Sequence, residues 1–197
     1  HSKLVTGGFW PPYLFVTFLS FSTAFVFPEN ISPSIVLYNH IMAIYKEEEI
    51  KALREAGKAA ATILLEVAQK IRPGVSALKL DNYAGELMDK LNVKSAPKTS
   101  ENFPGNTCIS INNIIAHGVP KKRVLRCNDL VNIDIAVVKN GFHSDIGFSF
   151  LIGAGNPIQQ RVIKCANESL ERAIDVCRPG VSFNAIGAAI HCTAKSH

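Results

Sequence analysis

The chain has 197 residues, of which 47% are apolar, so it can form one packed domain with an appendage and is not a disordered chain. Its net charge is only +5, and its longest basic run, Lys121-Lys122-Arg123, has the length of a solvated turn, so we expect no nucleic-acid partner. The five cysteines are odd in number and have no CxxC spacing, which excludes a disulfide scaffold and favours a reducing compartment.

Residues 1–41 form a hydrophobic extension of different composition. No residue between Lys3 and Glu29 is charged, and Phe9–Phe27 holds eight of the 16 aromatic residues. A run of ~20 apolar residues is long enough to span a bilayer, but Pro11-Pro12 interrupts a helix near its start. Met42 opens a stretch typical of the start of a soluble domain. We therefore interpret residues 1–41 as upstream or artefactual sequence and residues 42–197 as the domain, with a membrane anchor over residues 9–27 as the alternative.

A pentapeptide, Arg-Pro-Gly-Val-Ser, occurs at 72–76 and again at 178–182. Apolar residues at three- and four-residue steps predict a helix before and after each copy. Such a repeat indicates two related halves, that is, an α/β (α+β) fold with an internal pseudo-twofold repeat. The first half continues into strands over 108–153. The second ends at His197 after its second helix, so we expect it to be incomplete, lacking about 70–110 residues of sheet.

Two β-rich runs, 129–138 and 142–150, flank Asn140-Gly141. Asn-Gly between such runs is the strongest short signal for a β-hairpin. With a two-residue turn, Lys139 pairs with Phe142. Asp134 then faces Gly147, and Ala136 faces Asp145.

This register places Asp134 and Asp145 as diagonal neighbours on one sheet face. Two carboxylates on a partly buried face repel each other and lose hydration, and divalent cations between them would relieve both effects. Two alternatives stay open: both groups lie on an exposed polar face, or a one-residue bulge separates them. His143 falls on the same face, where a packed or solvated histidine is the more common case.

His117 follows the apolar run Ile114-Ile115-Ala116 and precedes Gly118-Val119-Pro120. A histidine at a strand end beside a tight turn can reach into a cleft, so His117 is a candidate functional residue.

Four segments resemble, in order and spacing, the type I methionine aminopeptidases. They are Cys-Ile-Ser-Ile-Asn at 108–112, Ala-His-Gly-Val-Pro at 116–120, Asp-Leu-Val-Asn-Ile-Asp at 129–134 and Asn-Gly-Phe-His-Ser-Asp at 140–145. Prolidases and aminopeptidase P share the fold and the two Asp, but not the first two segments together. The resemblance covers about residues 42–197. It implies the pita-bread fold of peptidase family M24, with residues 42–197 as the N-terminal part of a methionine aminopeptidase domain.

The resemblance also implies roles for individual residues. Two divalent metal ions (Co, Mn, Fe or Zn) are expected, with Asp134 a bidentate ligand of one and Asp145 a bridging ligand. His117 is expected to contact the substrate and to steady the tetrahedral intermediate. Phe103 and Cys108 are expected to line the methionine pocket, and Asn112 to lie in a loop that binds a monovalent cation. The family's other ligands, one His and two Glu, would fall beyond His197.

The activity that the resemblance implies is removal of the initiator methionine by a cytoplasmic monomer. Its partners would be nascent polypeptides with an N-terminal methionine and, as a further candidate, the ribosome; no membrane partner is expected. Because this chain carries two of the five metal-ligand residues, we expect it to be a fragment that is inactive alone. The alternative function is a non-catalytic, degenerate pita-bread binding module.

Overall fold

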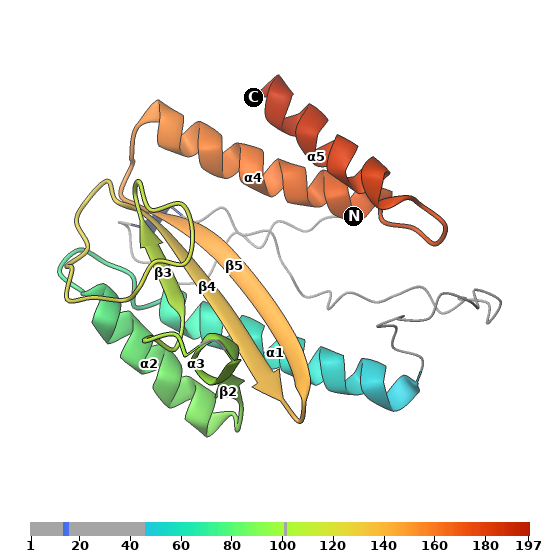
Figure 1. The fold of residues 1–197 in the computed structure, drawn as a ribbon. Helices are drawn as coiled ribbons and strands as arrows, with labels where there is room; N and C mark the ends of the chain where they lie inside the picture. Colours follow the sequence, from blue (N-terminus) through green and yellow to red (C-terminus); the bar gives the residue numbers. More distant parts are fainter. Residues whose placement is uncertain (1–13, 16–45, 101) are drawn as a thin grey trace. The chain divides into compact units, whose positions relative to one another are not determined.

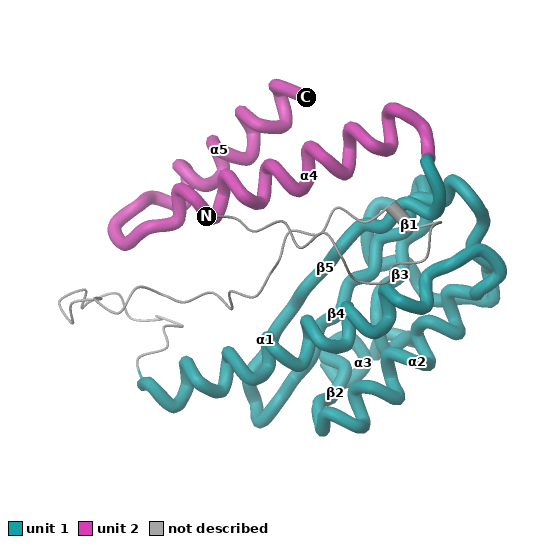
Figure 2. The backbone as a smooth tube through the Cα atoms, turned by 180° about the vertical axis from the view of Figure 1, so that it is seen from behind, with its two compact units in different colours: residues 1–27, 37–154 teal, residues 28–36, 155–197 magenta. Residues whose placement is uncertain are grey.

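A computed structural model of the chain describes residues 14–15, 46–100 and 102–197 (Figure 1). The described residues up to Ala154 belong to one compact unit, and residues 155–197 belong to a second (Figure 2). The expected boundary between residues 41 and 42, and Met42 itself, lie outside the described residues. Within the described residues, no helix is long and apolar enough to cross a membrane.

Two helices of the first unit carry its apolar core. Helix α1 (Glu47–Ala68) begins with three glutamates, which complement the positive end of the helix dipole, and buries residues spaced three and four apart, from Ala56 to Ala68. Helix α2 (Ala77–Lys90) begins at Ser76, whose hydroxyl accepts a hydrogen bond from the Lys79 amide at 3.3 Å. Both helices were expected from the sequence pattern and are confirmed.

The helices pack on an antiparallel sheet. Its described strands run in the order β1 (Leu14–Phe15), β5 (Phe142–Ile152), β4 (Leu130–Lys139) and β2 (Lys94–Ser95), and β3 (Cys108–Ile111) also pairs with β4. The strands predicted within 108–153 are therefore present. The sequence did not indicate β2 or the short helix α3 (Ala96–Ser100) that follows it. The apolar run 114–116 is not a strand: it is exposed, Ile115 to 97%, in an irregular loop after β3.

The two faces of the sheet differ in chemistry. Alternate residues of β4, from Val131 to Val137, are fully buried with Ile109 and Phe150 in the core shared with α1 and α2. The ribbon views show α1 lying across this face (Figures 1 and 2). The residues between them in sequence point to the opposite face. That face carries polar side chains such as Asn132, which donates to Ser149 Oγ at 3.1 Å.

The second unit is a helical hairpin. Helix α4 (Pro157–Val176) is capped by Asn156, which accepts from the Gln159 amide at 2.9 Å, and α5 (Phe183–Ser196) is capped by Ser182. The repeated pentapeptide occupies the same place in each unit. Its glycines, Gly74 and Gly180, both have positive φ (90° and 81°), and its serine caps the following helix. The structure thus confirms that the sequence repeat is a structural repeat.

The turn between β4 and β5 depends on two residues in the left-handed region. Asn140 has φ 52° and Gly141 has φ 84°, as a two-residue hairpin turn that follows the strand twist requires. We expect Gly141→Ala to lower the free energy of unfolding by about 1–2 kcal/mol, because a Cβ there is strained in this region. Urea unfolding followed by circular dichroism measures the change.

Gly57→Ala is the matched control. Gly57 lies inside α1, and a Cβ there would meet Ser144 Oγ at an ordinary 3.7 Å. This substitution should leave stability unchanged or raise it by up to about 1 kcal/mol. Equal effects of the two substitutions on the free energy of unfolding would show that the left-handed backbone of Gly141 is not the cause of the loss.

Candidate metal centre

The hairpin brings the two predicted carboxylates together. Asp134 is paired with Gly147, and Ala136 with Asp145. The pairing is uninterrupted along the whole of β4, from Leu130 to Lys139. The predicted register is confirmed, and no bulge separates the two groups. Both side chains therefore lie on the sheet face opposite the core, and they are close enough to share a hydrogen bond.

The pair is electrostatically unfavourable at neutral pH. Three effects together raise the pKa of Asp134 to about 6: burial, which is the largest, and then the hydrogen bond to Asp145 and the negative charge of Asp145. The nearby His117 opposes them. A positive ion between the two carboxylates would compensate both the lost hydration and the repulsion. The electrostatics thus fit a cation-binding role.

Gly147 keeps the space over the pair open. A Cβ at this position would lie 3.5 Å from Asp134 Oδ1, so any longer side chain would cover that oxygen. The sequence interpretation did not single out Gly147. A glycine inside a strand is, however, a known sign of a close approach by a ligand or backbone.

Two further predicted residues lie beside Asp134. Cys108 is paired directly with Asp134 across β3 and β4 and is only 5% exposed. Its Sγ lies 4.0 Å from Nδ1 of His117. The structure therefore brings Cys108, His117, Asp134 and Asp145 into one cluster, drawn from β3, the loop after it, β4 and β5.

The sequence indicated that His117 lies at a strand end, but the structure places it in a loop, where its neighbour Gly118 holds it. The residue has φ 53°, and the next residue, Gly118, bonds back to β3: Ile109 N donates to Gly118 O at 2.8 Å, and Gly118 N donates to Ser110 Oγ at 3.1 Å. A Cβ on Gly118 would lie 2.3 Å from Ile109 O. Only glycine allows this close approach, which sets the position of His117 over the sheet.

Asn112 lies at the other end of β3, away from this cluster. Its amide donates to Asp129 Oδ1 at 2.8 Å and its side-chain oxygen accepts from the Leu130 amide at 2.9 Å. Burial opposes ionisation of Asp129, but the Arg126 amide, Asn112 and Arg123 outweigh it and lower the pKa of Asp129. The Asn112 side chain thus ties β3 to β4, and its place in a cation-binding loop stays a prediction.

Phe103 lies in the loop between α3 and β3. Its side chain is half-buried, and its amide donates to Pro97 O at 3.2 Å. The loop also contains Thr107, the residue before Cys108. Because Phe103 precedes Cys108 by only five residues, a common pocket is compatible with the chain path, but the role of Phe103 is still a prediction.

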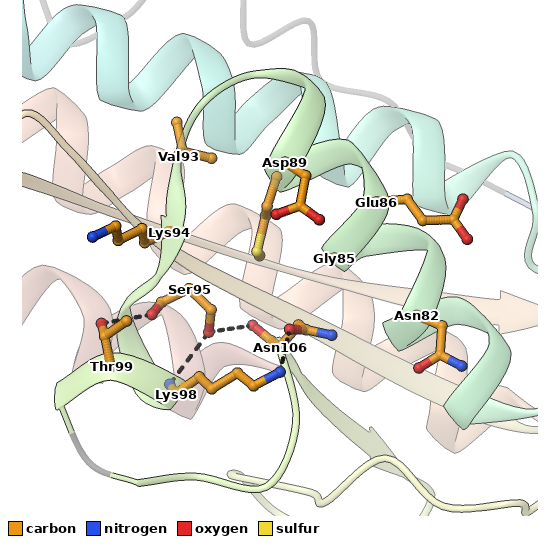
Figure 3. A pocket seen from close by; sticks show the side chains of 11 residues that line it. Asn82, Gly85, Glu86, Asp89, Val93, Lys94, Ser95, Lys98, Thr99 and Asn106 are labelled. Carbon is orange, nitrogen blue, oxygen red and sulfur yellow. Dashed lines mark hydrogen bonds between the residues drawn. The ribbon is translucent and has the colours of Figure 1, made fainter.

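A buried carboxylate that sequence reasoning missed anchors this loop. Asp81 of α2 is 3% exposed and accepts from the Asn106 amide at 2.9 Å and from the amide and hydroxyl of Thr107, each at 2.8 Å. Asn106 also accepts from Lys98 Nζ at 3.2 Å in a groove of about 530 Å³ between α2 and α3 (Figure 3). That groove lies away from the Asp134–Asp145 pair, so it is not the candidate metal centre.

The donor set is suited to a metal but is partial. Carboxylate oxygens with a nearby imidazole suit Mg, Mn, Zn or Fe better than Cu(I). Over the part of the chain that the structure describes, no three His, Cys, Asp or Glu side chains converge closely enough to hold an ion by themselves. Asp134 and Asp145 therefore fit as two members of a larger ligand set.

Comparison with known proteins decides the family. The model of metallopeptidase family M24 matches residues 51–197. The chain belongs to family M24. It is 41% identical over 157 residues to a methionine aminopeptidase of Staphylococcus epidermidis, an alignment that covers 79% of this chain and 62% of that protein. Family M24 is a metallopeptidase family, which implies a divalent metal cofactor.

Solved structures agree with this assignment. The crystal structure of methionine aminopeptidase from Thermotoga maritima matches with a TM-score of 0.76 and 30% identity, over 79% of this chain and 63% of that one. The prolidase from Pyrococcus furiosus matches with a TM-score of 0.67 and 21% identity, over 78% of this chain and 44% of that one, which shows the fold alone. The expected pita-bread fold is confirmed, and this M24 chain spans about 62% of the length of the Staphylococcus relative.

The raised pKa of Asp134 predicts an unusual pH dependence of the stability of the folded chain. The pKa of Asp134 is about 6 in the folded chain against an ordinary 3.8, so the folded state holds this proton more tightly than the unfolded state. Its contribution to stability therefore falls as pH rises from about 4 through 6 in the metal-free protein. Asp134→Asn should be more stable than the wild type at pH 7 in EDTA, and the difference should vanish toward pH 4.

Urea unfolding of both proteins from pH 4 to 8, with and without Mn²⁺, measures this difference. Mn²⁺ should stabilise the wild type above pH 6 and leave Asp134→Asn unchanged. The exposed Asp89→Asn serves as the control and should show no such pH-dependent difference. A difference between wild type and Asp134→Asn that is constant with pH would contradict the proposed repulsion.

The Asp81 anchor predicts a large stability effect far from any ligand. Asp81→Ala leaves the amide and hydroxyl of the buried Thr107, and the half-buried Asn106 amide, without this acceptor, and each buried donor costs about 1–3 kcal/mol. We expect a loss of about 3 kcal/mol or more in urea unfolding. Asp89→Ala, on an exposed position of the same helix, should change stability by less than about 0.5 kcal/mol. Similar losses in both variants would exclude a specific anchor.

Proposed function

We propose that this chain is part of a methionine aminopeptidase that removes the initiator methionine from nascent proteins. The observation that carries the proposal is the Asp134–Asp145 pair, held by the register of the hairpin with Cys108 and His117 beside it. Similarity to methionine aminopeptidases of Staphylococcus epidermidis and Thermotoga maritima supports it. Residues 42–197 would be the N-terminal part of the methionine aminopeptidase domain, with residues 1–41 as an extension outside it.

Asp134 and Asp145 would hold two divalent metal ions, drawn from Co, Mn, Fe and Zn, together with ligands from further residues. When bound, such ions lower the pKa of a shared water and supply the nucleophile for hydrolysis. The contribution of this chain is to fix the two carboxylates on one rigid sheet face. The raised pKa of Asp134 makes metal binding compete with protonation, so binding would weaken as pH falls through about 6.

His117 would donate a hydrogen bond to the oxygen that gains negative charge during attack on the first peptide bond. Its position beside the carboxylate pair, with Nδ1 4.0 Å from Cys108 Sγ, supports this role, because a donor there can reach a substrate held at the pair. Cys108, buried next to both, and Phe103 would form the apolar pocket for the methionine side chain. Asn112 would help to shape the loop that binds a monovalent cation.

The expected surroundings follow from this function. The partners would be polypeptides with an N-terminal methionine, and the ribosome, where such chains emerge, is a further candidate. We place the protein in the cytoplasm, which suits five cysteines that all remain thiols. A monomer would suffice, because the clustered residues come from a single chain.

A second candidate function is a non-catalytic binding module. It is favoured by one observation: among the described residues, no third His, Cys, Asp or Glu joins the carboxylate pair in a group that could hold an ion. Titration calorimetry of this chain with Mn²⁺ separates the two. Weak binding at the Asp134–Asp145 pair is expected under either function, whereas tight binding of two ions would exclude the non-catalytic module.

A chimera tests the peptidase directly. Residues 42–197 are joined to the part of the Staphylococcus epidermidis relative that extends beyond its matched residues. We expect the chimera to release methionine from Met-Ala-Ser in the presence of Co²⁺ or Mn²⁺, and EDTA to abolish the reaction. His117→Ala should lower kcat by roughly 10²–10³-fold, as loss of an oxyanion donor does.

Asp134→Asn and Asp145→Asn provide the decisive comparison. Each should lower kcat/KM by about 100-fold or more, since even partners outside the ligand shell contribute 10–100-fold. His143→Ala, on the same sheet face but opposite Val138, is the matched control and should retain activity. An active chimera that tolerates both Asp substitutions would refute the assignment of the metal centre.

A further inference from the structure

Two segments far apart in the sequence are joined on the surface of the first unit. The turn between α1 and α2 pairs with the loop that leads into β4: Gly74 N donates to Leu125 O at 3.0 Å, Leu125 N donates to Val75 O at 2.8 Å, and Ala77 N donates to Arg123 O at 3.0 Å. The ribbon shows this loop beside the turn (Figure 1). Their side chains therefore share one surface.

This surface is strongly basic. Residues 69–80 and 120–128 contain no Asp or Glu. They expose seven cations. Lys70 lies over the ring of Tyr83, and the other six form what we call the basic patch: Arg72, Lys79, Lys121, Lys122, Arg123 and Arg126. The two carboxylates that directly follow these segments, Asp81 and Asp129, are buried, and Asp129 is paired with Arg123 at 3.1 Å.

The basic patch is also shaped and anchored. Leu125 is 1% exposed and fixes the centre of the loop in the core. On either side of it, Arg123 and Arg126 line a hollow of about 320 Å³ together with Val124. The bond from Arg123 to Asp129 Oδ1 restricts that guanidinium before any ligand arrives. Two arginines around a hollow suit a phosphate, which a guanidinium fork binds with two parallel hydrogen bonds.

We infer that the basic patch docks the phosphate backbone of a double-helical nucleic acid. Neither segment contains a Phe, Tyr or Trp. Single-stranded ligands are bound by stacking bases on aromatic side chains, and membrane-surface segments insert aromatic or large apolar ones, so both are disfavoured. What the patch offers is charge and hydrogen-bond donors, which recognise backbone phosphates independently of base sequence.

This inference revises the expectation of no nucleic-acid partner. Along the sequence only three cations are consecutive, and the fold adds three more from Arg72, Lys79 and Arg126. It is independent of peptidase activity, because none of the six cations belongs to the candidate metal centre. RNA and DNA duplexes present the same phosphate chemistry, so the experiment has to separate them.

Fluorescence anisotropy of labelled 20-base-pair RNA and DNA duplexes tests the patch with the full chain. We expect the wild type to bind with Kd of roughly 1–100 µM at physiological salt, as non-specific contacts do. Lys121→Gln/Lys122→Gln/Arg126→Gln should weaken binding by at least about tenfold and reduce the dependence of log K on log salt by about 2–3. Preference for the RNA duplex would identify RNA as the source of the phosphates, and preference for the DNA duplex would identify DNA.

The matched control removes the same charge elsewhere on the first unit. Lys51→Gln/Lys58→Gln/Lys90→Gln replaces three exposed lysines of α1 and α2 and should bind duplexes as the wild type does. A second variant, Arg72→Gln/Lys79→Gln, tests the other segment of the patch, and thermal unfolding verifies that each protein is folded. Equal weakening by the patch and control variants would overturn the inference. So would binding to vesicles containing phosphatidylserine without binding to either duplex.

Discussion

The register between β4 and β5 is the constraint on which the rest of the structure depends, because it holds Asp134 and Asp145 beside each other in spite of their repulsion. This register is fixed from the opposite face of the sheet. A slip of one residue would move Ile133, Ile135 and Val137, all fully buried, into solvent. Burying each such side chain contributes about 1.5–3 kcal/mol. The core under α1 and α2 therefore holds two carboxylates in an arrangement that they would not adopt alone.

Much of this arrangement could be read from the sequence, because its determinants are local. Asn140-Gly141 specifies the turn, and the turn specifies every pair up to Leu130. The helices followed from their apolar spacing, and the repeated pentapeptide identified equivalent turns in both units. The positions of Asp134 and Asp145 thus follow from the Asn140-Gly141 turn and from the alternation of side chains between the two faces of a strand.

The parts that the sequence did not reveal depend on contacts between distant segments. The run Ile114–Ala116 has the composition of a strand, but Gly118 takes the position beside β3 that such a strand would need. Asp81 looks like any polar residue of an amphipathic helix until it is seen to accept from Thr107, 26 residues further on. The basic patch likewise exists only after the turn at Gly74 pairs with the loop at Leu125. Charge runs and periodicity carry no information on such pairs.

The repeated pentapeptide shows how one local structure acquires different uses. Both copies turn the chain at a glycine and cap the next helix with a serine. Arg178, the first residue of the second copy, donates to Ile174 O at 3.2 Å and to Cys177 O at 2.9 Å, which stabilises the carboxyl end of α4. Arg72, its counterpart, is exposed beside the loop from Lys121 to Arg126. The backbone role of the motif is set by its own residues, whereas the role of its arginine is set by the segment that packs against it.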